Sequence, residues 1–202
     1  MKESLLIIIL YALLILRVFC ALWSKKWGLE KLRNTCREYL DSFLVAGMIA
    51  IALITFVVRS FYIPSESMVP TLLVNDYLLV NKFVYHFTTP SRGEILVFIP
   101  PHMDTGKEVN FIKRVVAVEN DVLEVRSGVL YLNGLPMQEP FIKEPPVEDF
   151  GPYRVPPGHV FMMGDNRNNS DDSRYWGPLP LQNVVGKAEV IFWPLSRVRV
   201  IK

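Results

Sequence analysis

The sequence predicts a mainly β domain preceded by two membrane-spanning helices, and three observations lead to this fold class. The long apolar runs of the 202-residue chain are confined to its first 59 residues. The remainder contains short segments rich in Val, Ile, Leu and aromatic residues, separated by Gly, Pro, Asn and Asp. Such segments are typical of strands and turns, and no amphipathic helical period of ten or more residues lies between them.

Composition divides the chain into two parts and excludes several classes of protein. Half of the residues are hydrophobic and 21% are charged, which excludes a disordered or collagen-like chain. Residues 1–59 carry 8 Lys and Arg against 4 Asp and Glu, whereas residues 60–202 carry 14 against 16 and offer no nucleic-acid surface. Both cysteines, Cys20 and Cys36, lie in the first part. The larger part therefore has no thiol for a disulfide, a metal site or a nucleophile.

The first apolar run covers residues 5–23 and is interrupted only by Arg17. At a helical rise of about 1.5 Å per residue, a run of this length spans roughly the 30 Å hydrocarbon core of a bilayer. No small-x-small motif for signal-peptide cleavage occurs at Val18 to Ala21. We therefore expect residues 1–23 to be an uncleaved transmembrane anchor.

The second apolar run extends from Phe43 to Val58, and we expect a second spanning helix at residues 42–59. Phe61 and Tyr62 follow it, as interfacial aromatic residues do where a helix leaves lipid. The connecting stretch 24–41 carries five Lys and Arg against three acidic residues. The positive-inside rule places this short basic loop in the cytoplasm and residues 60–202 outside.

Strands are predicted throughout the outer part, and their boundaries follow the turn residues. Ser127-Gly128 and Asn133-Gly134 enclose one strand in an arrangement suited to hairpins. Several prolines between Pro136 and Pro157 predict a long irregular connection. The predicted strands are 77–80, 94–99, 111–118, 122–125, 129–132, 160–163, 184–192 and 198–201.

Most common hydrolase motifs are absent from the sequence. There is no Gly-x-Ser-x-Gly elbow, no His-Glu-x-x-His and no Gly-rich phosphate loop, and the three histidines are scattered. Asp165, Asp171 and Asp172 form an acidic group without the ligand spacing of a calcium loop. We therefore expect no metal and no cofactor, and we look for a serine nucleophile that works without histidine.

Two serines, Ser65 and Ser67, lie in the segment 63–72 that follows the second apolar run. Pro64 and Pro70 disfavour helix and hold the backbone between them near extended or turn conformations. In extended backbone the two serine side chains project to one side. One hydroxyl could then attack a substrate while the other, with a backbone N–H, stabilises the oxyanion. Taken alone, however, such a pair more often belongs to an ordinary polar loop.

Without histidine, the candidate base for a serine is a lysine on an apolar strand, and Lys113 is one. With a pKa near 10.4, only about 0.1% of lysine is neutral at pH 7.5, so a working base must be buried. The neighbouring Arg114 leaves open which of the two side chains points inward. A dense polar loop at residues 164–177 could supply a supporting hydrogen-bond network, with Ser170 able to orient a lysine amine.

These three segments, in this order, resemble the bacterial type I signal peptidases, also called leader peptidases. The resemblance covers roughly residues 60–202, and the two-span arrangement before them is also similar. It implies a catalytic domain of coiled antiparallel sheets. The matching motifs are Pro64-Ser65-x-Ser67-Met68-x-Pro70-Thr71-Leu72, Lys113-Arg114-Val115-Val116 and Gly164-Asp165-Asn166-Arg167-x-Asn169-Ser170-x-Asp172-Ser173-Arg174.

The resemblance implies a role for each matching residue. Ser67 would be the nucleophile and Lys113 the general base. The Ser67 amide and the Ser65 hydroxyl would form the oxyanion hole, and Ser170 would orient the lysine. Asp165, Asp172 and Arg174 would support the site, and the shallow pockets for the −1 and −3 residues of the substrate would be lined by Phe61, Ile63, Met68, Leu72, Phe111 and Ile112.

The function implied by the resemblance is that of a membrane-bound serine endopeptidase. It would remove N-terminal signal peptides from exported preproteins after small residues, through an acyl-enzyme intermediate. It would be a multi-pass protein of the bacterial inner membrane with its catalytic domain on the periplasmic side. Its partners would be preproteins, the lipid bilayer and, by proximity, the export translocase; no nucleic acid is implied.

Four residues depart from the family pattern. Glu66 stands where Gly is frequent, Asn75 and Asn120 stand where Gly commonly precedes Asp, and Asn168 stands where Asp is usual. Asn tolerates positive φ, so the two turns could be preserved. The bulk of Glu66, next to the nucleophile, has no such explanation.

Two alternatives remain at this point. One is another Ser-Lys protease, such as a conjugative-transfer peptidase or a self-cleaving repressor, although repressors lack membrane spans and carry a DNA-binding region. The other is a membrane-tethered binding module or inactive homologue, against which the presence of both Ser67 and Lys113 argues.

Overall fold

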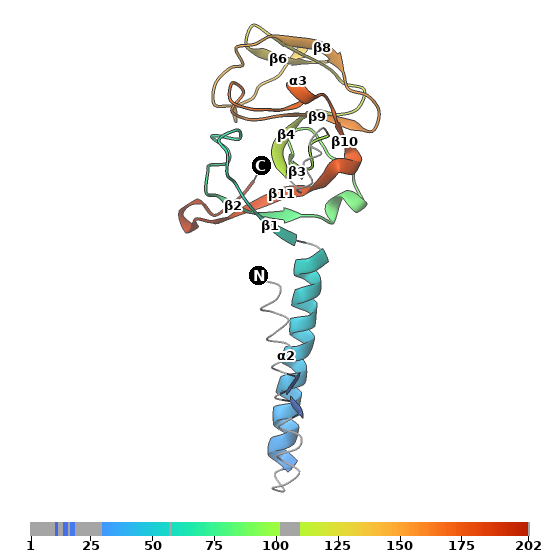
Figure 1. Cartoon of the computed structure of the whole chain (residues 1–202), viewed down its shortest axis with the longest axis vertical. Coiled ribbons are helices and arrows are strands. Elements are labelled where there is room, and N and C mark those ends of the chain that lie inside the picture. Colours follow the sequence, from blue (N-terminus) through green and yellow to red (C-terminus); the bar gives the residue numbers. More distant parts are fainter. Residues whose placement is uncertain are drawn as a thin grey trace. The chain divides into compact units, whose positions relative to one another are not determined.

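The computed structural model describes residues 11, 14, 15, 17, 18, 30–56, 58–101 and 110–201. The chain divides into two compact units, Met1–Val57 and Val58–Lys202, which are the helical and the β-rich parts of Figure 1. The predicted span at residues 5–23 and the start of the predicted basic loop lie largely outside the described residues.

The helical unit contains α2, which runs from Glu30 to Phe56. Asp41 of this helix pairs with Arg17, with 2.6 Å between the carboxylate and Nε. In the part of the chain that the structure describes, no helix combines the length and the apolar character needed to cross a membrane.

Both boundaries predicted for the second helix differ from those of α2. The helix includes residues 30–41, where we expected a loop, because this stretch contains good helix formers and neither Gly nor Pro. It also ends earlier, since residues 58–59 belong to β1 (Val58–Tyr62). Strand pairing with residues 77–81 determines the conformation there, and that contact is not visible in the local apolar pattern.

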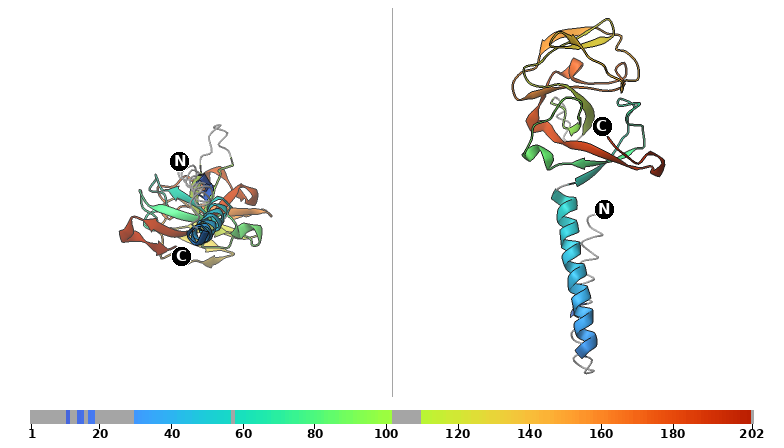
Figure 2. Two further views of the ribbon diagram at one scale, coloured as in Figure 1. Left: turned by 90° about the horizontal axis from the view of Figure 1, so that it is seen from below. Right: turned by 180° about the vertical axis from the view of Figure 1, so that it is seen from behind.

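The described residues of the β-rich unit form two antiparallel sheets. The larger one is eight-stranded in the order β1-β2-β11-β3-β4-β9-β10, with β12 paired to β11, and the smaller one has the order β7-β6-β5-β8. In Figure 1, β6 and β8 lie at the top of this unit, with α3 and β9 below them. The view from behind in Figure 2 shows β11 crossing the unit. The expectation of a mainly β domain with curled antiparallel sheets is confirmed.

Most elements of this unit fall where Val, Ile, Leu and aromatic residues are dense. The strands after β1 are β2 (Tyr77–Asn81), β3 (Ile95–Phe98), β4 (Phe111–Ala117), β5 (Val122–Arg126), β6 (Val129–Leu132), β7 (Leu135–Pro136), β8 (Phe150–Arg154), β9 (His159–Met163), β10 (Leu179–Pro180), β11 (Val184–Trp193) and β12 (Arg199–Val200). The short helices are η1 (Val84–His86), α3 (Ser173–Trp176), η2 (Leu181–Asn183) and η3 (Leu195–Arg197).

Four strands were not predicted from the sequence: β1, β7, β8 and β10. Three of them contain proline, and β8 lies inside the segment for which an irregular connection was expected. Proline is tolerated at sheet edges, and β7, β8 and β10 are edge strands of their sheets.

The predicted turns adopt the expected backbone conformations. Ser127 and Gly128 between β5 and β6 both have positive φ, 50° and 80°, as a type I′ hairpin turn requires. Asn75 and Asn120, which stand where the resembling family commonly has Gly, have φ of 75° and 69°. The expectation that Asn preserves these two turns is confirmed.

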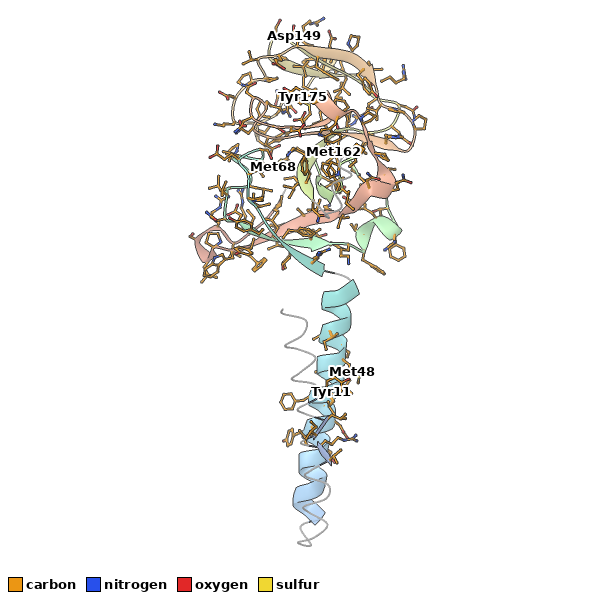
Figure 3. All side chains as sticks on the ribbon, in the orientation of Figure 1. Tyr11, Met48, Met68, Asp149, Met162 and Tyr175 are labelled. Atoms are coloured by element: carbon orange, nitrogen blue, oxygen red, sulfur yellow. The ribbon has the colours of Figure 1, made fainter. Side chains whose placement is uncertain are left out.

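Three apolar clusters form the core of the β-rich unit. One of them packs Met68 and Leu72 beneath the segment that carries Ser67, against side chains of β2, β3 and β11. Met68 and Met162 are labelled in Figure 3, and both are completely buried. Burial of side chains this large stabilises the unit and fixes the segment between β1 and β2 from below.

Candidate active site

Ser67 lies in the irregular segment that connects β1 to β2. The segment is closed at its base, because Ile63 N–H donates to the Asp76 carbonyl and Asn75 N–H donates to the Ile63 carbonyl, each at 3.0 Å. A helix-like turn follows Ser67, with Leu72 N–H bound to the Met68 carbonyl at 2.9 Å. Proline at both ends of the serine pair is compatible with this conformation because neither ring nitrogen has to donate.

Lys113 of β4 reaches Ser67 from 46 residues away in the sequence. Its Nζ donates to Ser67 Oγ at 2.7 Å, and the two residues are only 4% and 8% exposed. Burial lowers the pKa of Lys113 to about 8, although the negative charges of Asp172, Asp171 and Asp165 act in the opposite direction. Desolvation is therefore the dominant influence on this amine.

The second serine is close to the first. Ser65 Oγ and Ser67 Oγ are 3.3 Å apart, and either can donate. This arrangement agrees with the prediction that both side chains project to one side of the backbone.

Arg114, the neighbour of Lys113, is buried as well but serves a different partner. Its guanidinium donates to the Asp165 carboxylate at 2.9 and 2.8 Å and to the Gly93 carbonyl at 2.7 Å. Asp165 also accepts from Thr71 Oγ1. The question of which residue points inward is thus answered: both do, and Arg114 ties β4 to the polar loop while Lys113 faces Ser67.

Asp172 and Arg174 form a second buried ion pair in the polar loop, at 2.8 Å. Asp172 also accepts from Gly164 N–H at 3.0 Å and caps α3 by accepting from Arg174 N–H. Arg174 Nη2 donates to the Arg167 carbonyl at 2.6 Å. Every oxygen of the Asp172 carboxylate is therefore used, which is what a fully buried carboxylate requires.

Asn166 and Arg167 are important members of this loop to which sequence reasoning assigned no role. Asn166 N–H donates to the Ser67 carbonyl at 3.0 Å, and its Nδ2 donates to the Glu66 carbonyl at 3.1 Å. Arg167 is completely buried and pairs with Glu139 at 2.6 Å. The signals for them were the density of amides and arginines in the loop and their place in the matching motif Gly164-Asp165-Asn166-Arg167.

Ser170 is the predicted residue whose expected contact is missing. Its Oγ is buried and has no hydrogen-bond partner among the residues that the structure describes. It packs against Gly164, where an added Cβ would lie 2.3 Å from Ser170 Oγ and 2.5 Å from the Ser67 carbonyl oxygen. The absence of a side chain at Gly164 therefore permits the polar loop to contact the Ser67 segment.

A cleft of about 360 Å³ opens onto Ser67 and Lys113. Four of the predicted substrate-binding residues, Phe61, Ile63, Phe111 and Ile112, line it. The other two, Met68 and Leu72, lie completely buried in the core, outside the set of lining residues. The cleft is further lined by Tyr62, Pro64, Ser65, Glu66, Val97, Asn110, Asn169 and Asp171.

The residues that the structure describes form no cluster of metal-ligating side chains. Within residues 30–56, 58–101 and 110–201, no group of three or more His, Cys, Asp or Glu side chains is placed to hold a metal ion. The arrangement can supply a hydroxyl, a buried amine and backbone donors, which are the groups needed for acyl transfer.

Comparison with known proteins assigns the chain to a family. The family model described as signal peptidase, peptidase S26, matches residues 36–193. The chain belongs to this family. The resemblance noted from the motifs is confirmed, and so is the expected enzyme class, a serine endopeptidase.

Several curated members of the family are similar over most of this chain. A probable signal peptidase I-1 of Synechocystis is 47% identical over 80% of this chain and 84% of its own length. The signal peptidase I of Leptolyngbya laminosa is 45% identical over 80% and 81%. Thylakoidal processing peptidase 1 of Arabidopsis thaliana is 39% identical over 84% and 52%. A solved signal peptidase I from Enterococcus faecalis is 29% identical, with a TM-score of 0.43 over 50% of this chain and 97% of that chain.

Two departures from the usual S26 pattern have a visible structural setting. Asn168 accepts from Val147 N–H at 2.9 Å and donates through Nδ2 to the Pro145 carbonyl at 3.0 Å. An aspartate could make only the first of these bonds. Glu66 is exposed at the cleft, so its bulk is accommodated on the open side of the Ser67 segment.

Proposed function

We propose that this S26 peptidase removes N-terminal signal peptides from exported preproteins with Ser67 as nucleophile and Lys113 as general base. The observation that carries the proposal is the 2.7 Å hydrogen bond between Lys113 Nζ and Ser67 Oγ at the floor of a cleft. The relatives named signal peptidase I support the substrate class.

The lowered pKa of Lys113 allows the amine to accept a proton near neutral pH. With a pKa of about 8, about a quarter of the lysine is neutral at pH 7.5, against about 0.1% for an ordinary lysine. Neutral Lys113 takes the proton of Ser67 Oγ as that oxygen attacks the scissile carbonyl. The lysine then protonates the departing amine, which leaves an acyl-enzyme.

The developing oxyanion needs donors that are in place before the reaction. The Ser67 amide and the Ser65 hydroxyl, whose Oγ lies 3.3 Å from Ser67 Oγ, would supply them. Lys113 then activates a water molecule that hydrolyses the ester and releases the signal peptide. Asp165, Asp172 and Arg174 would hold the polar loop against the Ser67 segment, and Ser170 would pack against Gly164 where the two segments meet.

Substrate selection would take place in the apolar part of the cleft. Phe61, Ile63, Phe111 and Ile112 line it and leave room for small side chains at the −1 and −3 positions of the substrate. Met68 and Leu72 would shape the same pocket from beneath, as completely buried residues.

The location of the enzyme follows from its two apolar runs. We infer that residues 1–23 and the apolar part of α2, residues 42–56, span the inner membrane of a bacterium, with the basic residues between them in the cytoplasm. Residues 60–202 would then form the catalytic domain on the outer side, where translocated preproteins emerge. The lipid bilayer and the export translocase would be its neighbours there.

The dyad is tested with Ser67→Ala and Lys113→Ala in the full chain, incubated with a preprotein whose products are mapped by mass. Each variant should lose cleavage completely, because nucleophile and base act as one unit and their losses are not additive. Lys113→His should not restore activity, since the imidazole cannot reach the position of Nζ. Substantial cleavage by either alanine variant would refute the dyad, and a wild-type protein that binds but never cleaves would favour a binding module.

A further inference from the structure

The C-terminal segment of the chain contacts the segment that carries Ser67. The Thr71 carbonyl accepts a hydrogen bond from Arg199 Nη2 at 2.6 Å and a longer one from Arg197 Nη2 at 3.5 Å. Thr71 lies in the helix-like turn that begins immediately after Ser67. Carbonyl groups at the C-terminal end of such a turn lack partners within it, and cationic donors are favoured there.

Arg197 also secures the end of the same segment. Its Nε and Nη2 donate to the two Asp76 carboxylate oxygens at 2.8 and 2.9 Å. Asp76 is 1% exposed and additionally accepts from Leu73 N–H at 2.8 Å. One guanidinium thus bridges the turn after Ser67 and the residue that precedes β2.

Arg197 is the last residue of the short helix η3, and Arg199 lies in β12 of the large sheet. Arg199 in β12 is paired with Ile191 of β11, and Ile201 N–H donates to the Glu189 carbonyl at 2.8 Å. The same strand β11 pairs with β2, which begins where the Ser67 segment ends. Strand β11 therefore supports both β12, which carries Arg199, and β2, which follows the Ser67 segment.

We propose that Arg197 and Arg199 are positioning residues for Ser67, so that the C-terminal segment 197–201 is a working part of the catalytic apparatus. Neither arginine is among the described residues that line the cleft, so they act through the Ser67 segment and not on the substrate. By holding the turn from its far end, they keep Ser67 Oγ and the Ser67 amide in register with Lys113. This inference rests on the proposed function for its catalytic readout.

The two arginines differ in what their removal leaves behind. Without Arg197, the buried Asp76 carboxylate loses its ion-pair partner, so this variant risks failing to fold. Arg199 is exposed, and its hydrogen bond goes to a neutral carbonyl. Arg199→Ala leaves no buried charge unpaired and is therefore the informative substitution.

The experiment compares Arg199→Ala and Arg199→Lys with Arg126→Ala in the full chain. Arg126 is an exposed arginine of β5 in the smaller sheet and controls for loss of surface charge. We expect Arg199→Ala to lower kcat for preprotein cleavage about tenfold with little change in KM, since a small misplacement of a reacting group has a large effect on rate. Arg199→Lys should retain most of the activity, and Arg126→Ala should match the wild type.

Hydrogen exchange supplies a readout that does not depend on activity. Amides of residues 67–76 should exchange faster in Arg199→Ala than in Arg126→Ala, while the exchange of β5 and β6 and the urea midpoint stay unchanged. Wild-type kcat in Arg199→Ala, a change confined to KM, or unaltered exchange at residues 67–76 would overturn the inference. A wild-type protein without cleavage activity would instead refute the proposed function, and the exchange result would still decide whether Arg199 holds the segment.

Discussion

Burial and nearby negative charges act in opposite directions on the charged form of Lys113. An amine that is 4% exposed loses most of its hydration, and three aspartates restore only part of the stability of its charged form. The lowered pKa that results is a cost in folding free energy and an advantage for a general base.

At the residue scale, the rate of cleavage should report this pKa. Because burial lowers the Lys113 pKa to about 8, kcat/KM should rise with pH along an acid limb near that value and far below the ordinary lysine value. The measurement is kcat/KM for one preprotein across pH, with stability checked at each point. An acid limb near 10, or no limb at all, would remove Lys113 from the role of base.

The lowered pKa of Lys113 also predicts how Lys113→Met changes the stability of the protein. Below the folded pKa the native protein holds a buried charge, and this penalty disappears as pH rises from about 8 to the unfolded value near 10.5. Lys113→Met lacks this penalty. At neutral pH its free energy of unfolding should therefore equal that of the wild type or exceed it by up to roughly 3 kcal/mol. The difference should vanish near pH 10.5 in urea titrations. A markedly less stable variant at pH 7 would mean that Lys113 is a structural ion-pair residue.

At the scale of elements, the site depends on the close approach of two loops, one carrying Ser67 and the other carrying Gly164 and Asn166. Asn166 donates to the Glu66 and Ser67 carbonyls from the loop after β9. Gly164 makes this approach possible, since a Cβ there would lie 2.5 Å from the backbone oxygen of Ser67. A backbone atom cannot rotate away from such a contact as a side chain can.

Gly164→Ala should therefore separate the loop from the Ser67 segment. We expect a loss of about 2 kcal/mol or more in unfolding free energy and a decrease in kcat of about a hundredfold. The matched control is Gly158→Ala, where φ is 70° and nothing lies within 4 Å of the added Cβ. It should cost about 1 kcal/mol through its backbone conformation and leave kcat unchanged. Equal kinetic effects of the two substitutions would contradict this account.

At the scale of the whole molecule, the proposed topology places the basic stretch 24–41 and the catalytic residues 60–202 on opposite sides of a membrane. Protease added outside spheroplasts should digest the chain after about Tyr62, because residues 60–202 would be exposed there. The basic stretch 24–41 should stay protected, since short Lys- and Arg-rich loops remain in the cytoplasm. An epitope in each region, detected before and after lysis, provides the readout and its control. The opposite protection pattern would refute the orientation.

Local patterns in the sequence were sufficient for much of the β-rich unit. β6 and most of β2, β4, β5 and β9 coincide with dense runs of β-branched and aromatic residues, because such side chains fit a pleated, half-buried surface wherever they occur. Turn residues placed the β5–β6 hairpin for the same local reason. The motifs around Ser67 and Lys113, in their order, were enough to indicate the family.

Only the tertiary structure decided how these pieces combine. β1 and β8 depend on strand partners that local periodicity does not reveal, and the local pattern did not decide which of Lys113 and Arg114 points inward. Their separate partners, Ser67 for the lysine and Asp165 for the arginine, lie 46 and 51 residues away. The contacts of Arg197 and Arg199 with Thr71 span more than a hundred residues. The sequence determines which chemical groups are present. The distances between groups that are remote in sequence are determined only when the sheets pack around their apolar clusters.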